Sequence, residues 1–276
     1  MLDFRRFLPP LPSSLKRTWR NDGYALLKSA VSPVQIGSVE TLIDEQWERR
    51  EGNIHQLDIL TGNYAGRTFL MQEAPAETRN EAYKLNNLFL HNPVIRDLAY
   101  SPPIRKAVTD FLDGEPVICN SLNFARGSQQ DAHIDSWYMP APNGGPMVAV
   151  SIALDSVHTN NGPIFFIPGS QRIPPYKFSD GRLNIIAAEA EHCMEYLENE
   201  ITKRSLQRRD LVCNAGDAFI WHGQLIHGGS AIRDFSLTRK SLVVHYWRAT
   251  DVEPSHVIRD SHGAYLRRTL RGELSL

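Results

Sequence analysis

The sequence predicts an α+β protein in which a helical N-terminal layer packs on a β jelly roll. The first hundred residues contain repeated helix-start signals, whereas the residues after Gly114 contain short apolar runs of period two. Clusters of Gly, Pro and Asn separate these runs, as expected for turns between antiparallel strands. Helices followed by a series of short strands favour this architecture over a doubly wound parallel sheet.

Three helices are expected in the N-terminal layer, because a capping residue precedes a proline at three places. Ser and Asn accept hydrogen bonds from the free N–H groups at a helix start, and proline suits the first helical position. The three pairs are Ser32-Pro33, Asn92-Pro93 and Ser101-Pro102. After the first pair, apolar residues follow at helical spacing: Ile36, Val39, Ile43 and Trp47.

The clearest strand lies at residues 147–154, where large apolar side chains alternate with small ones. Further strands are expected at residues 164–167, 218–221 and 241–247. Between them, the glutamate-rich residues 183–206 predict a helical or irregular insertion. We therefore expect a single domain over residues 1–276. It consists of a mainly helical layer (1–115), a jelly-roll core (116–250) with an insertion near 172–210, and a C-terminal extension (251–276).

Composition excludes several classes of protein. The 276 residues are 42% hydrophobic and 22% charged, which excludes a disordered chain, and the net charge of -1 gives no general attraction to nucleic acid or anionic membranes. No apolar run is long enough to span a membrane, and the N-terminus lacks the apolar core of a signal peptide. Three cysteines without a CxxC pair indicate reduced thiols and a cytoplasmic protein. A homodimer is compatible with this composition.

A metal site is indicated by His133 and Asp135, which lie two residues apart and so share one face of an extended chain. His222 and His227 follow at a strand-to-turn junction. Two histidines and one carboxylate form the facial triad of non-haem Fe(II) oxygenases, which leaves positions open for other ligands. His222 and His227 are five residues apart, so on a continuous strand they face opposite sides. We select His227 as the ligand because Gly228 follows it and permits close backbone approach.

Four residues are candidates for binding or orienting small molecules. Arg239 stands at the start of the apolar run 241–247, from where a guanidinium directed into the barrel can pair bidentately with a carboxylate. Trp137 and Tyr138 follow the His133–Asp135 pair and are candidates to line a substrate pocket, although aromatic residues there are as often packing residues. His222 is assigned to the surroundings of the site, where it would orient a ligand or the substrate.

The chain resembles the phytanoyl-CoA dioxygenase-like branch of Fe(II)/2-oxoglutarate-dependent oxygenases over roughly residues 115–248. The matching stretches are Leu122-Asn123-Phe124, His133-Ile134-Asp135, Asn161-Gly162-Pro163 to Ser170, Gly216-Asp217, His222, His227-Gly228-Gly229-Ser230 and Thr238-Arg239-Lys240. The resemblance implies a double-stranded β-helix (a cupin-like jelly roll) with iron held by His133, Asp135 and His227.

The same resemblance assigns the co-substrate residues. It implies that Arg239 binds the distal carboxylate of 2-oxoglutarate and that Asn123 makes a polar contact to this co-substrate. In relatives a serine two residues after the distal histidine helps to hold that carboxylate. This chain has Gly229 there, and Ser230 is the serine nearest to that position.

We therefore expect an oxygenase that hydroxylates a small organic metabolite, as in secondary metabolism, while it converts 2-oxoglutarate and O2 to succinate and CO2. Asp135 argues against a halogenase, in which a small residue replaces this ligand. Desaturation, cyclisation and demethylation use the same residues and remain alternatives, as does a non-catalytic jelly-roll binding module. A zinc hydrolase would need no Arg239, and the chain contains neither GxSxG nor a P-loop.

Overall fold

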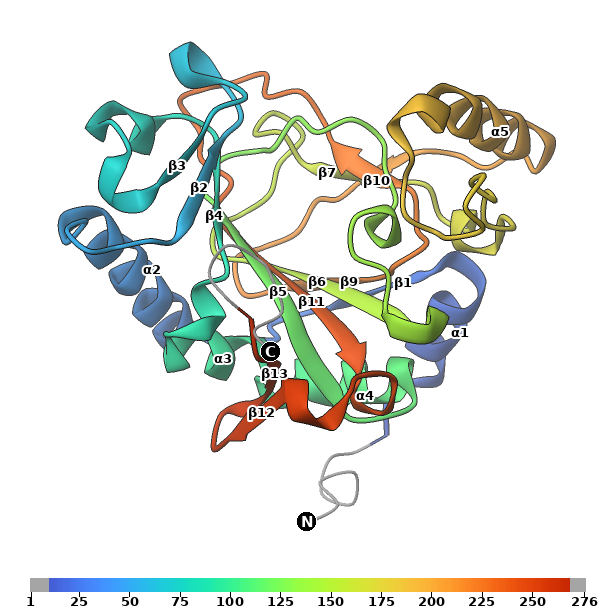
Figure 1. Ribbon diagram of the computed structural model, residues 1–276, viewed down its shortest axis with the longest axis horizontal. Helices are drawn as coiled ribbons and strands as arrows, with labels where there is room; N and C mark the ends of the chain where they lie inside the picture. Colours follow the sequence, from blue (N-terminus) through green and yellow to red (C-terminus); the bar gives the residue numbers. More distant parts are fainter. Residues whose placement is uncertain (1–9, 269–276) are drawn as a thin grey trace.

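The structure, a computed structural model, describes residues 10–268 and consists of two facing β-sheets with helices around them (Figure 1). The helices are α1 (Ser13–Asp22), α2 (Pro33–Glu48), α3 (Pro93–Ala99), α4 (Pro102–Leu112) and α5 (Ala190–Lys203). The strands of the first half are β1 (Tyr24–Leu27), β2 (Gln56–Ile59), β3 (Thr68–Leu70), β4 (Tyr83–Asn86), β5 (Pro116–Phe124) and β6 (Met147–Ala153). Those of the second half are β7 (Ile164–Phe166), β8 (Arg209–Asp210), β9 (Ala218–His222), β10 (His227–Gly229), β11 (Ser241–Arg248), β12 (Val257–Asp260) and β13 (Gly263–Leu266).

The larger sheet has the order β1-β9-β6-β11-β5-β4-β2-β3, and β13 joins it beside β5. The smaller sheet has the order β10-β7-β8. Along these two paths every pair of neighbouring strands is antiparallel, so strands distant in sequence lie next to each other, as β5, β6 and β11 do. This arrangement is the jelly roll that the sequence predicts.

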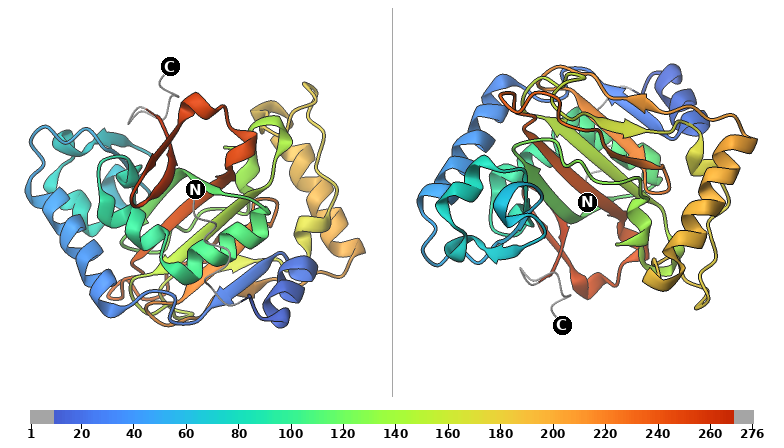
Figure 2. Two further views of the ribbon diagram at one scale, coloured as in Figure 1. Left: turned by 90° about the horizontal axis from the view of Figure 1, so that it is seen from below. Right: turned by 90° about the horizontal axis from the view of Figure 1, so that it is seen from above.

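Strand β6 shows how the core is divided between the two faces of the larger sheet. Its large residues Val148, Val150 and Ile152 belong to the apolar cluster that contains Ile104 and Val108 of α4. Its small residues Ala149 and Ala153 belong to a second cluster, with Phe219 and Trp221 of β9, between the two sheets. Figure 2 shows α4 running across the larger sheet on its outer face. The inner face is thereby left for the site.

Helices α2, α3 and α4 begin at the three predicted prolines. At α2 the Ser32 hydroxyl accepts a hydrogen bond from the backbone N–H of Gln35. The Gln35 side chain accepts one from the backbone N–H of Ser32, which completes a capping box. The N-terminal layer also contains α1 and strands β1 to β4, which the sequence analysis did not predict. These short strands exist because they extend the larger sheet, a nonlocal interaction that the local pattern does not reveal.

The predicted insertion contains α5, which packs Cys193 and Leu197 against Ile134 and Trp137. Cys119, Cys193 and Cys213 are all free and buried. Among residues 10–268, no helix combines the length and apolar character needed to cross a bilayer. Within the predicted C-terminal extension, β12 and β13 pair with each other, and residues 269–276 lie outside the described residues, as do residues 1–9 of the predicted N-terminal layer.

Candidate active site

Backbone pairing brings the predicted metal ligands together. His133 lies in the connection between β5 and β6, and His227 begins β10. The two residues form an antiparallel bridge in which the N–H of His133 donates to the carbonyl of His227 at 2.8 Å, and the reverse hydrogen bond is 3.0 Å long. Asp135 then starts a single helical turn, Asp135–Trp137, that directs its carboxylate inward. The bridge thereby holds His133 and His227 side by side although they are far apart in the chain.

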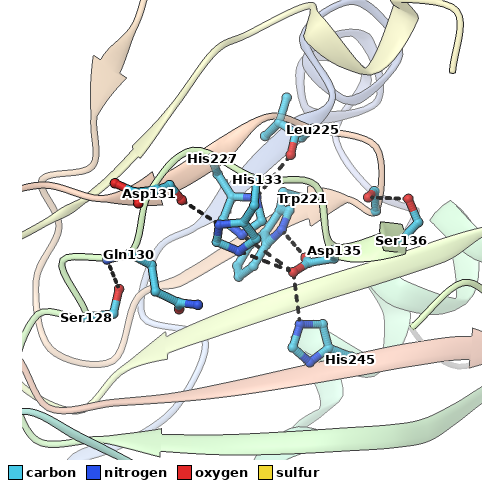
Figure 3. Close-up of polar contacts among 11 residues, drawn as sticks. Ser128, Gln130, Asp131, His133, Asp135, Ser136, Trp221, Leu225, His227 and His245 are labelled. Atoms are coloured by element: carbon cyan, nitrogen blue, oxygen red, sulfur yellow. Dashed lines mark hydrogen bonds and ion pairs between the residues drawn. The ribbon is translucent and has the colours of Figure 1, made fainter. Parts of the chain in front are cut away.

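The side chains of His133, Asp135 and His227 converge as Figure 3 shows. Each offers one ligand atom, and these atoms all lie within 4.8 Å of one another. Oδ1 of Asp135 is 3.6 Å from Nε2 of His227 and 3.9 Å from Nε2 of His133. Nδ1 of His133 lies 2.8 Å from the carbonyl of Asp131, and Nδ1 of His227 lies 3.0 Å from the carbonyl of Leu225. Because a carbonyl only accepts, both Nδ1 atoms carry the proton, which leaves each Nε2 lone pair free for a metal.

Asp135 is buried among groups that stabilise its charge. Oδ2 accepts a hydrogen bond of 2.8 Å from the indole N–H of Trp221. Burial raises the pKa of Asp135, but the imidazoles of His227, His245 and His133 outweigh it and hold the pKa well below its usual range. Burial lowers the pKa of His227 to about 4, so this imidazole is neutral at pH 7, as a metal ligand must be.

These residues fit a divalent iron ion. Two imidazole nitrogens and one carboxylate oxygen are the donor set of the non-haem iron facial triad, and these three side chains, which line the cavity, would hold the ion. The carboxylate offsets part of the metal charge, and the carbonyls behind the two imidazoles fix their orientation.

The triad lines a cavity of about 50 Å³, and Arg239 lines the same cavity. This arginine is only 3% exposed, and burial lowers its pKa to about 10, so it remains charged at pH 7. Among residues 10–268 no carboxylate forms an ion pair with Arg239, and its buried Nε donates no hydrogen bond to any of them. A buried guanidinium without an ion-pair partner is costly, so the cavity is suited to an anion beside Arg239.

Asn123, Ser230 and His222 were predicted near the site, but the structure directs each of them away from the cavity. Leu122 and Phe124 line the cavity, so Asn123 between them faces the other side of β5, where its amide donates to the carbonyl of Ser241 at 3.4 Å. In β9, Trp221 lines the cavity, so His222 faces outward, where its ring packs 5.9 Å from that of Trp19 in α1. The sequence expectation that His222 orients a ligand or substrate is therefore not supported by this placement.

Ser230 lies three residues after His227, which places the two side chains on opposite sides of the chain. Its hydroxyl donates to Asp210 at 2.8 Å and accepts from Arg208 at 2.8 Å. These contacts form part of a separate groove that does not include the triad. A contact between Ser230 and a co-substrate at Arg239 is not supported by this placement.

The two aromatic candidates differ in their surroundings. Trp137 is buried and packs in the cluster beneath α5. Tyr138 is 60% exposed, and its ring lies 5.9 Å from that of His133. Tyr138 therefore stands beside the metal position on the solvent side, whereas Trp137 is a packing residue.

The sequence analysis missed two residues of β11. His245 lines the cavity, and Ser241 shares its strand face, with a buried hydroxyl that has no hydrogen-bond partner among residues 10–268. The sequence contains a pattern that could have found them. Alternate residues of a strand share a face, so an inward-facing Arg239 predicts that Ser241, Val243 and His245 also face inward.

Comparisons with known proteins agree with this fold and site. A family model described as phytanoyl-CoA dioxygenase (PhyH) matches residues 19–239. An ectoine dioxygenase from Halomonas elongata is 28% identical over 138 residues, which is 46% of this chain. The match spans 40% of the length of that relative.

Two solved structures have the same fold. The non-heme alpha ketoglutarate dependent carbocyclase SnoK from nogalamycin biosynthesis has a TM-score of 0.67 and 16% identity, over 89% of this chain and 86% of that chain. The apoform of EctD from S. alaskensis has a TM-score of 0.61 and 15% identity, over 88% of this chain and 79% of that chain. These likenesses confirm the predicted jelly-roll fold, and the match over residues 19–239 places this chain in the phytanoyl-CoA dioxygenase (PhyH) family.

Proposed function

We propose that this protein is an Fe(II)/2-oxoglutarate-dependent oxygenase. The observation that carries the proposal is one cavity lined both by the His133–Asp135–His227 triad and by Arg239, which has no ion-pair partner among residues 10–268. A metal site alone also fits a zinc hydrolase. A buried arginine that faces the same cavity fits a co-substrate that is both a metal chelator and a carboxylate, which describes 2-oxoglutarate.

In this proposal each side chain has a defined task. His133, Asp135 and His227 hold the iron. Arg239 pairs with the distal carboxylate of 2-oxoglutarate, and the unpartnered hydroxyl of Ser241 donates to the same end. When bound, the iron supplies the activation of O2 that couples conversion of 2-oxoglutarate to succinate and CO2 with oxidation of the substrate. The apolar walls, including Phe124 and Val243, exclude water and so strengthen the pairing at Arg239.

The proposed substrate is a small organic metabolite that enters beside Tyr138, and the proposed reaction is hydroxylation. The ectoine dioxygenase relative supports this assignment. The SnoK neighbour is a carbocyclase from nogalamycin biosynthesis, which supports a role in secondary metabolism. Cyclisation is therefore kept as an alternative reaction at the same site. Turnover of 2-oxoglutarate, screened against pools of small metabolites under O2, identifies the substrate.

The experiment that tests the oxygenase is an anaerobic titration of the protein with Fe(II) and then 2-oxoglutarate. A visible charge-transfer band is expected for the wild type and not for Asp135→Ala, which lacks the carboxylate ligand. His133→Ala and Asp135→Ala should both abolish iron-dependent succinate formation and leave the far-UV circular dichroism unchanged. A wild type that binds neither Fe(II) nor 2-oxoglutarate would instead support a non-catalytic jelly-roll module.

We further propose a single oxygenase domain in the cytoplasm. The three free, buried thiols support a reducing compartment, since none of them is paired. We also propose that the protein forms a homodimer. The molar mass from light scattering of the purified protein tests this against a monomer of 31.2 kDa.

A further inference from the structure

His245 lies in the wall of the same cavity and has no assigned task. It is a residue of β11, it is 2% exposed, and it faces inward like Val243 and Arg239 at alternate positions of the chain. Figure 3 shows its ring directed at the carboxylate of Asp135. A buried imidazole at this place requires a physical reason, because buried polar groups are costly unless they have partners.

The two oxygens of Asp135 have different partners. Oδ2 accepts the short hydrogen bond from Trp221. Oδ1 lies 3.5 Å from Nε2 of His245 and is also the oxygen nearer to the two ligand histidines. Oδ1 is therefore the oxygen available to a metal, and His245 contacts that same atom. A carboxylate oxygen has two lone pairs, so it can bind a metal and accept from an N–H together.

His245 is not itself a member of the ligand set. Among the described residues, the group whose ligand atoms lie within 4.8 Å of one another contains His133, Asp135 and His227 alone. Nδ1 of His245 is buried and has no hydrogen-bond partner among residues 10–268. A buried N–H without a partner is rarer in proteins than a buried acceptor without one, so the proton belongs on Nε2, facing Asp135.

We propose that His245 is a positioning residue of the metal site. Its Nε2–H and the indole N–H of Trp221 hold the two oxygens of Asp135 from two directions, and they fix the carboxylate plane so that Oδ1 faces His133 and His227. The inference rests on the proposed function only for the identity of the metal. In this proposal His245 orients the ligand Asp135, whereas Arg239, six residues earlier on the same side of the chain, binds the co-substrate.

The test is the affinity of the apoprotein for Fe(II), measured anaerobically by competition with a chromophoric chelator. Loss of a residue that orients a ligand typically lowers metal affinity about 10–100-fold, and this loss is expected for His245→Leu. His245→Gln places an amide nitrogen where Nε2 lies and should restore most of the affinity. His245→Asn places it near Nδ1 and should not. The matched control is His222→Leu, because His222 is a histidine of β9 that faces away from the cavity, and this variant should bind Fe(II) as the wild type does.

Unchanged Fe(II) affinity in His245→Leu, or equal rescue by Asn and Gln, would overturn this inference and leave the proposed function standing. No Fe(II) binding by the wild type would overturn both. If His245→Leu does not fold, the Gln and Asn pair decides, because the two variants differ only in the reach of the amide.

Discussion

At the residue scale, a side chain belongs to the site only if it points from its strand towards the cavity. His227 and His222 illustrate this, since both lie near one turn, His227 buried and His222 half-buried. Nε2 of His227 lies 3.6 Å from Asp135, whereas His222 packs beside Trp19 of α1. Burial lowers the pKa of both, so protonation does not distinguish them, and only direction does.

We predict that His227→Ala loses Fe(II) binding at stoichiometric iron and that His222→Ala retains it. The reason is that one substitution removes a ligand and the other removes an outward-facing ring. Equilibrium dialysis with metal analysis measures both. If the two results were exchanged, the assignment of His227 would be wrong and the strand register through Trp221 would need revision.

Arg239→Ala is predicted to raise the 2-oxoglutarate concentration needed for half-maximal turnover by ~30–150-fold. This range corresponds to about 2–3 kcal/mol for a charge-assisted bidentate pair in a buried site. Arg239→Lys should recover only part of the loss, because an ammonium does not reproduce the planar fork. Fe(II) affinity without co-substrate serves as the control and should not change. A normal 2-oxoglutarate requirement in Arg239→Ala would indicate another anchoring cation, with Arg233 and Arg126 the next to substitute.

At the element scale, β10 constrains the site, because the residue after His227 lies very close to β7 and to the loop before His133. A Cβ on Gly228 would lie 2.6 Å from ring atoms of Phe165 in β7 and 2.7 Å from the carbonyl oxygen of Gln130. These contacts are shorter than van der Waals distances, and one of them involves backbone that cannot rotate away. Glycine at this position therefore lets the two strands and the loop before His133 close around the ligands.

Gly228→Ala should accordingly lower Fe(II) affinity although it changes no ligand. The added methyl group separates β10 from the loop at Gln130 and so displaces His227 from His133. The control is Gly37→Ala, because Gly37 in α2 has open space where a Cβ would lie. Gly144 also has open space, but its φ of 68° would strain an alanine there, so Gly144→Ala is not a suitable control. Chelator competition on Gly228→Ala and Gly37→Ala measures the difference, and equal affinities would show that the close approach is not needed.

His55, directly before β2, makes stability depend on pH. Burial lowers its pKa from 6.5 to about 4, its Nδ1 lies 3.1 Å from the carbonyl of Asn86, and its ring lies 5.8 Å from that of His91. The unfolded chain takes up a proton below pH 6.5 while the folded protein does not, so stability falls as the pH drops from 6.5 to 4. The full loss from this residue is roughly 3 kcal/mol, at 1.36 kcal/mol per pKa unit.

The measurement is the free energy of urea unfolding at pH 7.5 and pH 5 for the wild type and His55→Gln. Other buried histidines also destabilise the wild type in acid, so the quantity to compare is the change between the two pH values. We expect a smaller change in His55→Gln. Equal changes in the two proteins would show that His55 is protonated in the folded protein.

At the scale of the whole molecule, the site joins parts of the chain that are far apart in sequence. The ligands come from the connection after β5 and from β10, and Arg239 precedes β11. Ligands that bind only this assembled arrangement stabilise the whole fold.

Fe(II) and 2-oxoglutarate, each at 100 times its dissociation constant, should therefore raise the melting temperature under anaerobic conditions. One ligand at this level adds about 2.7 kcal/mol, which corresponds to roughly 5–10 °C for a protein of this size. Differential scanning fluorimetry measures the shift. Asp135→Ala should lose the part of the shift that depends on iron, and an equal shift in that variant would place the metal elsewhere.

The amino-acid sequence by itself determined the features that depend on local chemistry. Proline at the first helical position marked the starts of α2, α3 and α4, whereas of the three predicted capping residues only Ser32 caps its helix through its side chain. Alternation of large and small residues fixed β6. The spacing of His133 and Asp135 identified two candidate ligands, because residues two positions apart along an extended chain share a face. The choice of His227 rested on the glycines that follow it in the sequence and on the interval to Arg239.

Only the tertiary structure decided the features that depend on strand pairing. Strands β1 to β4 form because an existing sheet offers free edges, and no pattern within four residues specifies that. The pairing also decided that Asn123, Ser230 and His222 face away from the cavity and that His245 faces into it. A shift of one residue in a strand exchanges its two faces, and the register is set by contacts between distant segments, so the sequence supplied the candidate residues and the assembled sheets selected among them.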